Sequence, residues 1–175
     1  LLYTTNPPYE ILSNNFISYD EIINLKKIES LVDRYNNSGS FQNTLDYFIL
    51  EKGIAPFTFF QKFVDYWEEQ GLFKVSHNKE KLYEILMNFS YALEENRYFM
   101  REVIKLDYLM YNKLTLPNFI ESTSPRKEEV FELLKDPNFK AKYLPSQIDI
   151  SAKRLYKEVQ IEIFKYDMTN LTTPV

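Results

Sequence analysis

Apolar residues recur every three or four positions over most of this sequence, which is the spacing of helices with one buried face. The first such pattern begins at Ser18, where Ser18 and Glu21 have the spacing of a capping box. Its apolar face consists of Ile22, Leu25, Ile28, Val32 and Tyr35. The pattern predicts a helix over residues 19–35, and the run from Tyr35 to Gly39 is typical of a helix end followed by a turn.

The same period predicts further helices in the ranges 41–51, 79–94, 98–111 and 124–135, and one that runs from Pro56 or Thr58 to Gly71. Ser40 is the expected N-terminal cap of the second helix, which stops at Gly53. Because the turn between the first two helices is short, we expect these helices to pack as an antiparallel hairpin.

The period changes near the end of the chain, where residues 157–166 alternate between apolar and polar positions. Val159, Ile161 and Ile163 fall on one side of this segment, as in a strand with one face in water. A lone strand leaves its backbone groups unpaired. We therefore expect a partner in the preceding stretch QIDIS, in the chain end, or in another part of a longer protein.

Together these patterns predict a mainly α fold, a single multi-helix domain of about six helices with a small C-terminal β-strand or hairpin. The length of the chain suits one sizeable core. Residues 1–17, which contain Pro7 and Pro8, are interpreted as a linker from missing upstream domains, and residues 18–175 as a helical accessory domain. The first residue is leucine rather than methionine, so we expect a fragment of a longer protein.

Composition narrows the possible functions. The formal net charge is -4, which leaves no basic stripe for a phosphate backbone, so nucleic-acid binding is disfavoured. The chain has no cysteine and therefore cannot form a disulfide or ligate an iron-sulfur cluster with its own residues. No apolar run approaches the roughly 20 residues that span a bilayer, so we expect a cytoplasmic protein without a membrane partner.

Signatures of catalysis are absent from the sequence, which contains no Gly-rich phosphate loop and no metal-binding motif. The only histidine, His77, lies in a polar connection and is interpreted as a solvated loop residue. The aromatic residues around Phe60 and Trp67 could line a pocket for a flat ligand, but their helical spacing favours a core. No catalytic, cofactor-binding or metal-binding residue is therefore assigned.

Two carboxylates fall on apolar faces of predicted helices, Asp107 near Val103 and Met110, and Glu29 among Ile22, Leu25 and Val32. A buried carboxylate must be paired, hydrogen-bonded or protonated. We expect each to accept hydrogen bonds from a neighbouring helix and to stabilise the packing, with contact to a substrate or partner as the alternative. Asn36 and Asn37, in the turn after the first helix, are further candidates for ligand contact.

Several stretches of the sequence are distinctive, namely PPYEIL, SYDEIINLKKIESLVDRYNNSGSF, FTFFQKFVDYWEEQGLF, IKLDYL and VQIEIFKYD. In these stretches, in this order, the chain resembles the uncharacterised C-terminal domain of bacterial radical SAM proteins that also carry a cobalamin-binding domain. Those proteins are often labelled anaerobic Mg-protoporphyrin IX monomethyl ester cyclase-like.

The resemblance implies a parent protein from an anaerobic bacterium, with an upstream cobalamin-binding domain and a partial barrel. That barrel would hold a 4Fe-4S cluster through a three-cysteine motif and cleave S-adenosylmethionine. Because this chain lacks cysteine, no residue that binds the cluster or S-adenosylmethionine can be assigned in it from the resemblance. The resemblance therefore implies an accessory domain that packs on the upstream domains and helps to shape or cover the substrate site. The alternative is a free-standing helical protein-interaction module that binds a partner through its aromatic faces.

Overall fold

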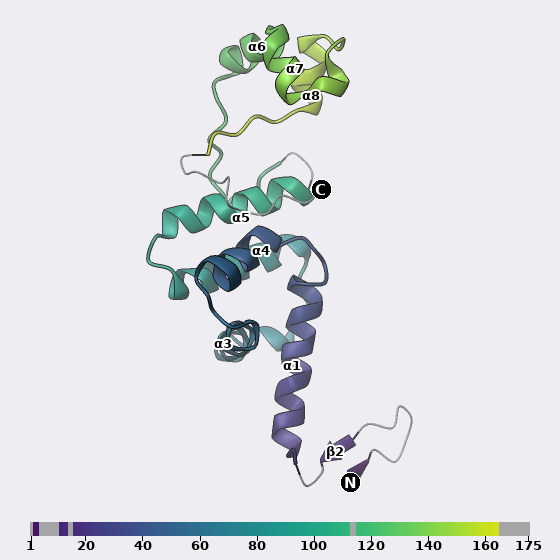
Figure 1. Ribbon diagram of the computed structural model, residues 1–175, viewed down its shortest axis with the longest axis vertical. Helices are drawn as coiled ribbons and strands as arrows, with labels where there is room; N and C mark the ends of the chain where they lie inside the picture. Colours follow the sequence, from purple (N-terminus) through teal and green to yellow (C-terminus); the bar gives the residue numbers. More distant parts are fainter. Residues whose placement is uncertain (1, 4–10, 14–15, 113–114, 165–175) are drawn as a thin grey trace.

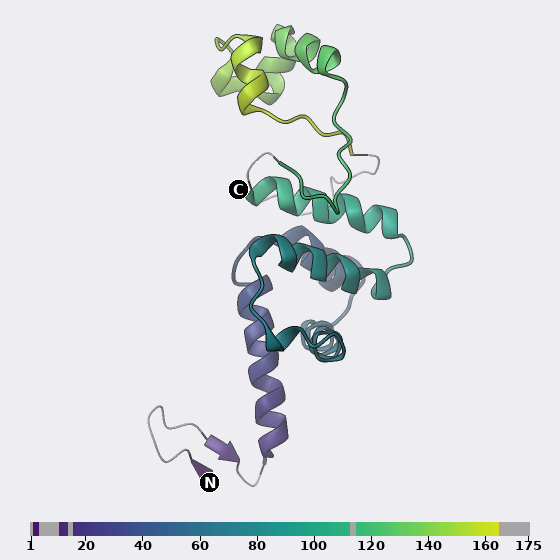
Figure 2. The ribbon, with the colours of Figure 1, turned by 180° about the vertical axis from the view of Figure 1, so that it is seen from behind.

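The computed structural model describes residues 2–3, 11–13, 16–112 and 115–164 of the chain. Within these ranges the protein is mainly helical. It is elongated and has two parts, a main lobe that contains helices α1 to α5 and a small lobe that contains helices α6 to α8 (Figure 1). Two extended connections, residues 121–126 and residues 159–164, join the small lobe to the main lobe (Figure 2).

The main lobe consists of α1 (Tyr19–Tyr35), α2 (Gln42–Asp46), the π-helix η1 (Tyr47–Glu51), α3 (Pro56–Glu69), the 3-10 helix η2 (Leu72–Lys74), α4 (Lys79–Leu93) and α5 (Arg97–Tyr111). The small lobe consists of α6 (Lys127–Lys135), α7 (Pro137–Tyr143), the 3-10 helix η3 (Pro145–Gln147) and α8 (Ala152–Glu158). Before α1, strands β1 (Leu2–Tyr3) and β2 (Ile11–Ser13) pair in antiparallel fashion.

Helix α1 begins and ends where the sequence predicts. The Ser18 backbone N–H donates to Glu21 Oε2 at 2.7 Å, and the Glu21 N–H donates to Ser18 Oγ at 3.3 Å, which completes the capping box. After the helix, Gly39 has a φ of 69°, a left-handed conformation that favours glycine. These local interactions involve neighbours in sequence, so the pattern of residues is enough to predict them.

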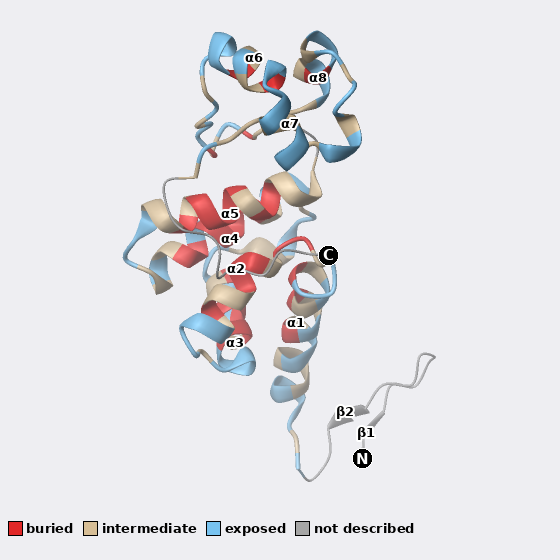
Figure 3. Cartoon of the chain, turned by 45° about the horizontal axis from the view of Figure 1, so that its top comes forward, coloured by how far each residue is buried: buried red, intermediate tan, exposed pale blue. Residues whose placement is uncertain are grey.

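The core of the main lobe is rich in aromatic rings. The Phe63 ring stacks on the Phe89 ring with centroids 4.4 Å apart, and the Tyr35 ring meets Phe63 edge-on at 4.8 Å. Helix α1 packs along α3, while α2 and α4 pack along α5, and Figure 3 shows buried residues concentrated in these helices. The expected antiparallel hairpin of the first two helices is not formed, because α1 packs along α3 and α2 packs along α5, although the Tyr35 and Phe41 rings meet at 4.8 Å in the turn between them.

The small lobe has a separate and much smaller core, whose buried side chains are Val130, Leu134 and Leu155. Helices α7 and α8 were not predicted, because each has only 7 residues and too few apolar positions to show a period. Helix α6 begins at Lys127, later than the predicted start at Ser124. The mainly α class is confirmed, but the count of about six helices is too low for the described residues. The division into a linker over 1–17 and one domain over 18–175 stays a prediction.

The predicted C-terminal strand is wrong for the part of it that the structure describes, residues 157–164. Helix α8 continues to Glu158, and residues 159–164 are extended without a strand ladder. Val159 and Ile161 pack on the core of the small lobe. This packing explains the alternation of apolar and polar residues without a neighbouring strand. Residues 165 and 166 of the predicted strand lie outside the described residues.

Candidate functional site

Asp107, on α5, is completely buried and accepts hydrogen bonds from the N-terminus of α2. Its Oδ1 accepts from the backbone N–H and the side-chain Nδ2 of Asn43, each at 2.9 Å. Its Oδ2 accepts from the Thr44 backbone N–H at 2.9 Å and from Thr44 Oγ1 at 2.6 Å. The carboxylate therefore satisfies the free amides of a helix that lies 64 residues earlier in the sequence than Asp107.

Asp107 takes the capping role that the sequence assigns to Ser40. The N-terminal cap position of α2 is occupied by Phe41, whose side chain makes no capping hydrogen bond, and Ser40 Oγ instead donates to the Ser38 carbonyl. Burial raises the pKa of Asp107 to about 6, although its hydrogen bonds to Thr44 and Asn43 act in the opposite direction. Because both oxygens are occupied by protein donors, the geometry favours the packing role over contact with a substrate.

Tyr83 and Asn112 extend this polar network along the same helices. The Tyr83 hydroxyl donates to the Ser40 carbonyl at 2.7 Å, and Asn112 Nδ2 donates to the Tyr83 oxygen at 3.1 Å and to the Tyr108 carbonyl at 2.8 Å. Burial raises the pKa of Tyr83, so its hydroxyl stays protonated at neutral pH. The network ties the turn before α2 to helices α4 and α5.

A second polar cluster joins α5 to both extended connections, and we call it the clasp. It consists of the buried side chains of Glu102, Lys105 and Glu162, the half-buried Thr123 and the exposed Ser122. Lys105 Nζ donates to Glu102 Oε1 at 3.0 Å and to Thr123 Oγ1 at 2.7 Å, and lies 4.0 Å from Glu162 Oε2. The side chains of Lys105 and Glu162 are 0% and 2% exposed. A lysine this deeply buried needs such partners, because an unpaired buried charge is costly.

Glu162 is the centre of the clasp on the C-terminal side. It accepts hydrogen bonds from Ser122 Oγ at 2.6 Å, from the Thr123 N–H at 2.6 Å and from Gln160 Nε2 at 2.7 Å. Burial raises the pKa of Glu162, but these hydrogen bonds outweigh that effect, so the pKa of the carboxyl is lowered. The two extended connections are therefore held to each other as well as to α5.

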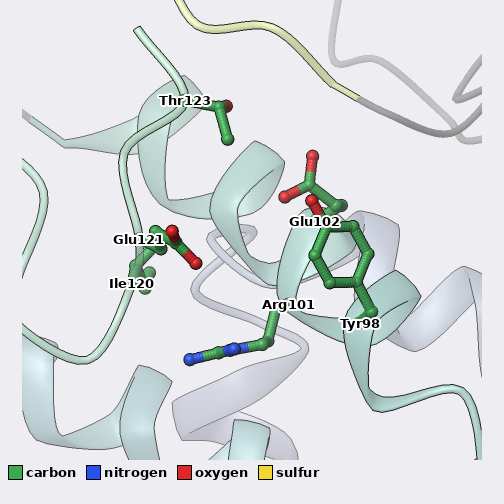
Figure 4. A pocket seen from close by; sticks show the side chains of 6 residues that line it. All are labelled: Tyr98, Arg101, Glu102, Ile120, Glu121 and Thr123. Carbon is green, nitrogen blue, oxygen red and sulfur yellow. The ribbon is translucent and has the colours of Figure 1, made fainter.

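A small cavity adjoins the clasp and is lined by Tyr98, Arg101, Glu102, Ile120, Glu121 and Thr123 (Figure 4). Its volume is about 10 Å³, which is room for about one water molecule. In Figure 4, Tyr98 and Glu102 project from α5 towards Thr123. The cavity is thus too small for an organic substrate, and we interpret it as part of the packing around the clasp.

The clasp was not predicted from the sequence, although part of its signal is present there. Lys105 lies two positions before Asp107 in an apolar stretch of α5, where a cation on a buried face needs a carboxylate. Glu162 was placed on the wet face of a strand, but its side chain is buried against Ser122 and Thr123. Only the fold brings these residues together, since Thr123 and Glu162 are 39 positions apart.

The burial expected for Glu29 is wrong, because this residue is exposed. The buried residues of α1 are Ile28, Leu31 and Tyr35, a stripe narrower than the apolar face read from the sequence, so its neighbour Glu29 points away from the core. Even Leu25 remains 43% exposed.

Asn36 and Asn37 lie on the surface at the end of α1. The Asn36 N–H donates to the Val32 carbonyl at 2.8 Å, and Asn37 Nδ2 donates to Asp33 Oδ1 at 2.6 Å. Neither asparagine is among the hydrogen-bond partners of Asp107, and Glu29 is not among them either. The structure therefore does not gather the predicted candidates into one site.

His77 packs against the C-terminal end of α3. One of its ring nitrogens, Nε2, lies 2.9 Å from the Leu72 carbonyl, and its ring meets Trp67 edge-on at 5.3 Å. The residue is half-buried, which differs from the solvated loop position that the sequence suggests. These contacts are those of a packing residue.

An apolar groove opens on the surface between α1 and α3, and we call it the α1–α3 groove. It is lined by Ile17, Asp20, Glu21, Asn24, Leu25 and Phe57 and has a volume of about 480 Å³. Phe57 is 59% exposed. Asn24 Nδ2 donates to Gln61 Oε1 at 2.6 Å and joins the two helices beside the groove. The groove combines apolar walls with two carboxylates, Asp20 and Glu21.

The chain contains no cysteine to ligate an iron-sulfur cluster. Within the described ranges, no group of three His, Cys, Asp or Glu side chains is placed to hold a metal ion. Among the described helices, none has both the length and the apolar character required to cross a membrane.

No curated protein and no solved structure shows significant similarity to this sequence. A family model described as "Protein of unknown function (DUF4080)" matches residues 1–174. The match covers nearly the whole chain, and the chain therefore belongs to the DUF4080 family.

Proposed function

We propose that this chain is the C-terminal accessory domain of a radical SAM enzyme that also binds cobalamin, and that it packs on the upstream domains through the α1–α3 groove. The observation that carries the proposal is the groove itself, in which Phe57 is 59% exposed and Leu25 is 43% exposed. The resemblance of the five quoted stretches supplies the identity of the upstream domains.

Burial of exposed apolar side chains provides the driving force for such docking. Complete burial of one large apolar side chain stabilises a contact by about 1.5–3 kcal/mol. Asp20 and Glu21 at the start of α1 would form a polar rim around the apolar contact of Leu25 and Phe57, an arrangement common in protein interfaces. The groove therefore has the composition of a contact surface between domains.

In this proposal the upstream domains hold the 4Fe-4S cluster, S-adenosylmethionine and cobalamin. The domain described here would cover the open side of the catalytic barrel, help to shape the substrate site and exclude water from it. The substrate and the reaction are properties of the parent enzyme.

The proposal is tested on the full-length protein by photo-crosslinking. A benzophenone amino acid is placed at position 57, and a matched control carries it at position 75, because Phe57 and Val75 have similar exposure, 59% and 61%. Val75 follows η2 and does not line the groove. We expect crosslinks to the upstream domains from position 57 and none from position 75.

Two results would contradict the proposal. Crosslinks from position 57 that stay within this domain would show that the groove does not meet the upstream domains. A full-length gene without a three-cysteine cluster motif would exclude a radical SAM parent. If translation instead starts directly before Leu1, the result would favour the alternative hypothesis of a free-standing helical protein-interaction module.

A further inference from the structure

Residues 159–163 form an extended segment that runs from α8 towards α5 (Figures 1 and 2). Beside the segment lies a groove of about 460 Å³, whose other wall is formed by Phe139, Tyr143 and Leu144. Ile163 and Tyr143 are 53% and 58% exposed. The groove belongs to the small lobe and is distinct from the α1–α3 groove of the main lobe.

One edge of the segment already has a neighbour. The Ile163 N–H donates to the Thr123 carbonyl at 3.4 Å, and the Ile163 carbonyl accepts from Thr123 Oγ1 at 2.6 Å. In an extended chain, successive residues direct their backbone groups to opposite edges. The backbone groups of Gln160 and Glu162 therefore face the other edge.

That other edge is unpaired in the part of the chain that the structure describes. The backbone N–H and carbonyl groups of Gln160 and Glu162 have no hydrogen-bond partner among the described residues. A row of unpaired backbone groups on an extended segment is a template for pairing with a further strand. The surface therefore suits an extended segment rather than a helix.

The sequence of the segment is complementary to itself when it is read in the antiparallel direction. With Ile161 opposite Ile161, Val159 lies opposite Ile163, and Gln160 lies opposite Glu162. Apolar residues then meet apolar residues and an amide meets a carboxylate, whereas parallel pairing in register would oppose Glu162 to Glu162. In the antiparallel register, residues 160 and 162 form the hydrogen-bonded pairs and use their unpaired backbone groups.

We propose that residues 159–163 pair edge to edge with the same segment of a second copy of this chain, antiparallel about a twofold axis at Ile161. The contact is isologous, since the same residues contribute from both copies. It places Ile163 and the groove beside it in the interface. Because the paired segment is short, the contact area is below that of a standard stable interface, and the dimer depends on protein concentration.

The absence of cysteine from this chain permits a direct test with the 175-residue protein. Ile161→Cys places two thiols opposite each other at the twofold axis, in a non-hydrogen-bonded pair whose spacing suits a disulfide. We expect mild oxidation to link Ile161→Cys dimers at least tenfold faster than Ile148→Cys dimers. Ile148 is an exposed residue of the same lobe, with 42% exposure, and does not line the groove.

The antiparallel register, which places Val159 opposite Ile163, predicts a second result. A mixture of Val159→Cys and Ile163→Cys proteins should form mixed dimers faster than either variant links to itself. Circular dichroism confirms that each variant retains its helices. An Ile161→Cys rate equal to that of Ile148→Cys, or self-linking of Ile163→Cys as fast as mixed linking, would overturn the proposal.

A measurement without cysteine keeps the test independent of the chemistry of the thiols. Sedimentation of the wild type should show a dimer that Ile163→Asp weakens at least tenfold and that Ile148→Asp leaves unchanged. A wild-type protein that stays monomeric at all concentrations would also overturn the proposal. A Phe57→Asp variant should dimerise normally, so this result is separate from the docking of the α1–α3 groove.

Discussion

The two lobes of this protein are held together by different means. The main lobe buries a continuous cluster of aromatic and aliphatic side chains from α1 to α5, whereas the small lobe buries only Val130, Leu134 and Leu155. A large core supplies most of the stability of a domain, and a core of this small size contributes little. We infer that the main lobe is a stable scaffold and that the small lobe depends on the clasp that secures its two connections.

The two regions also differ in how the surroundings of their buried carboxylates shift the pKa. Asp107 accepts only from α2 in the main lobe, and its pKa is raised to about 6. Glu162 lies where the connections meet, and its pKa is lowered. One carboxylate is thus destabilised by burial when it is ionised, while the other is stabilised by its donors.

The largest expected effect concerns the core of the main lobe. Phe63→Ala removes a completely buried ring that stacks on Phe89, and we expect the free energy of unfolding to fall by about 4 kcal/mol. The only tryptophan, Trp67, lies in the same core and reports the transition by fluorescence in a denaturant titration.

The matched change in the small lobe is Leu134→Ala, which also removes a completely buried side chain. We expect the Trp67 transition to shift by less than about 0.5 kcal/mol, while amide hydrogen exchange in α6 and α8 becomes rapid. If both variants shift the Trp67 transition equally, the lobes unfold as one unit and the comparison fails.

The next effect concerns the clasp. Lys105→Met leaves Glu102 and Glu162 buried without their cation, so we expect a loss of about 3 kcal/mol. Hydrogen exchange should rise most in residues 121–126 and in the small lobe. As a control, the triple variant Lys105→Met, Glu102→Gln, Glu162→Gln should recover part of the loss, because it also removes the two buried carboxylate charges that Lys105 compensates.

A smaller effect is expected at Asp107, and it depends on pH. Asp107→Asn places an amide among donors, and we expect a cost of about 2 kcal/mol at pH 7. Because the pKa of Asp107 is raised from 3.8 to about 6, the folded protein binds a proton that the unfolded chain has lost, and wild-type stability falls as the pH rises through this window. The difference in the free energy of unfolding between wild type and Asp107→Asn, measured by urea unfolding, should therefore narrow as the pH rises from about 4 to about 6.

Glu162 provides a control for the direction of this pH dependence of stability. Its pKa is lowered, so its contribution to stability is present above the unfolded pKa and is lost as the pH falls through the folded pKa. The difference between wild type and Glu162→Gln should be greatest at neutral pH and shrink below about pH 4.5. Equal pH dependence of the two variants would contradict the assigned environments.

The smallest effect is expected at Glu29, the other carboxylate that the sequence placed on an apolar face. It is exposed, so Glu29→Gln should change the free energy of unfolding by less than about 0.5 kcal/mol. A loss comparable to that of Asp107→Asn, in the same urea titration, would show that the residue is buried in solution.

Local patterns gave reliable predictions where the interacting residues are neighbours in sequence. The capping box of Ser18 and Glu21 and the end of α1 at Tyr35 depend on residues within one or two turns. The start of α3 at Pro56 is one of the two starts that the sequence allowed. The alternation in residues 159–163 was misread, because packing on a small core favours the same pattern as a strand. Glu29 was misplaced because a helical wheel shows which residues share a face but not how much of that face is covered.

The residue pattern alone was enough to predict the mainly helical class, the bounds of the longest helices, and the need of a carboxylate at position 107 for partners. The identity of those partners, Asn43 and Thr44, the clasp of Lys105 and Glu162, and the separate core of the small lobe could be known only from the folded chain. The two kinds of information differ in the sequence distance between the residues that interact. Helix signals are set by residues a few positions apart, whereas buried polar groups find donors and acceptors that the chain brings together only when it folds.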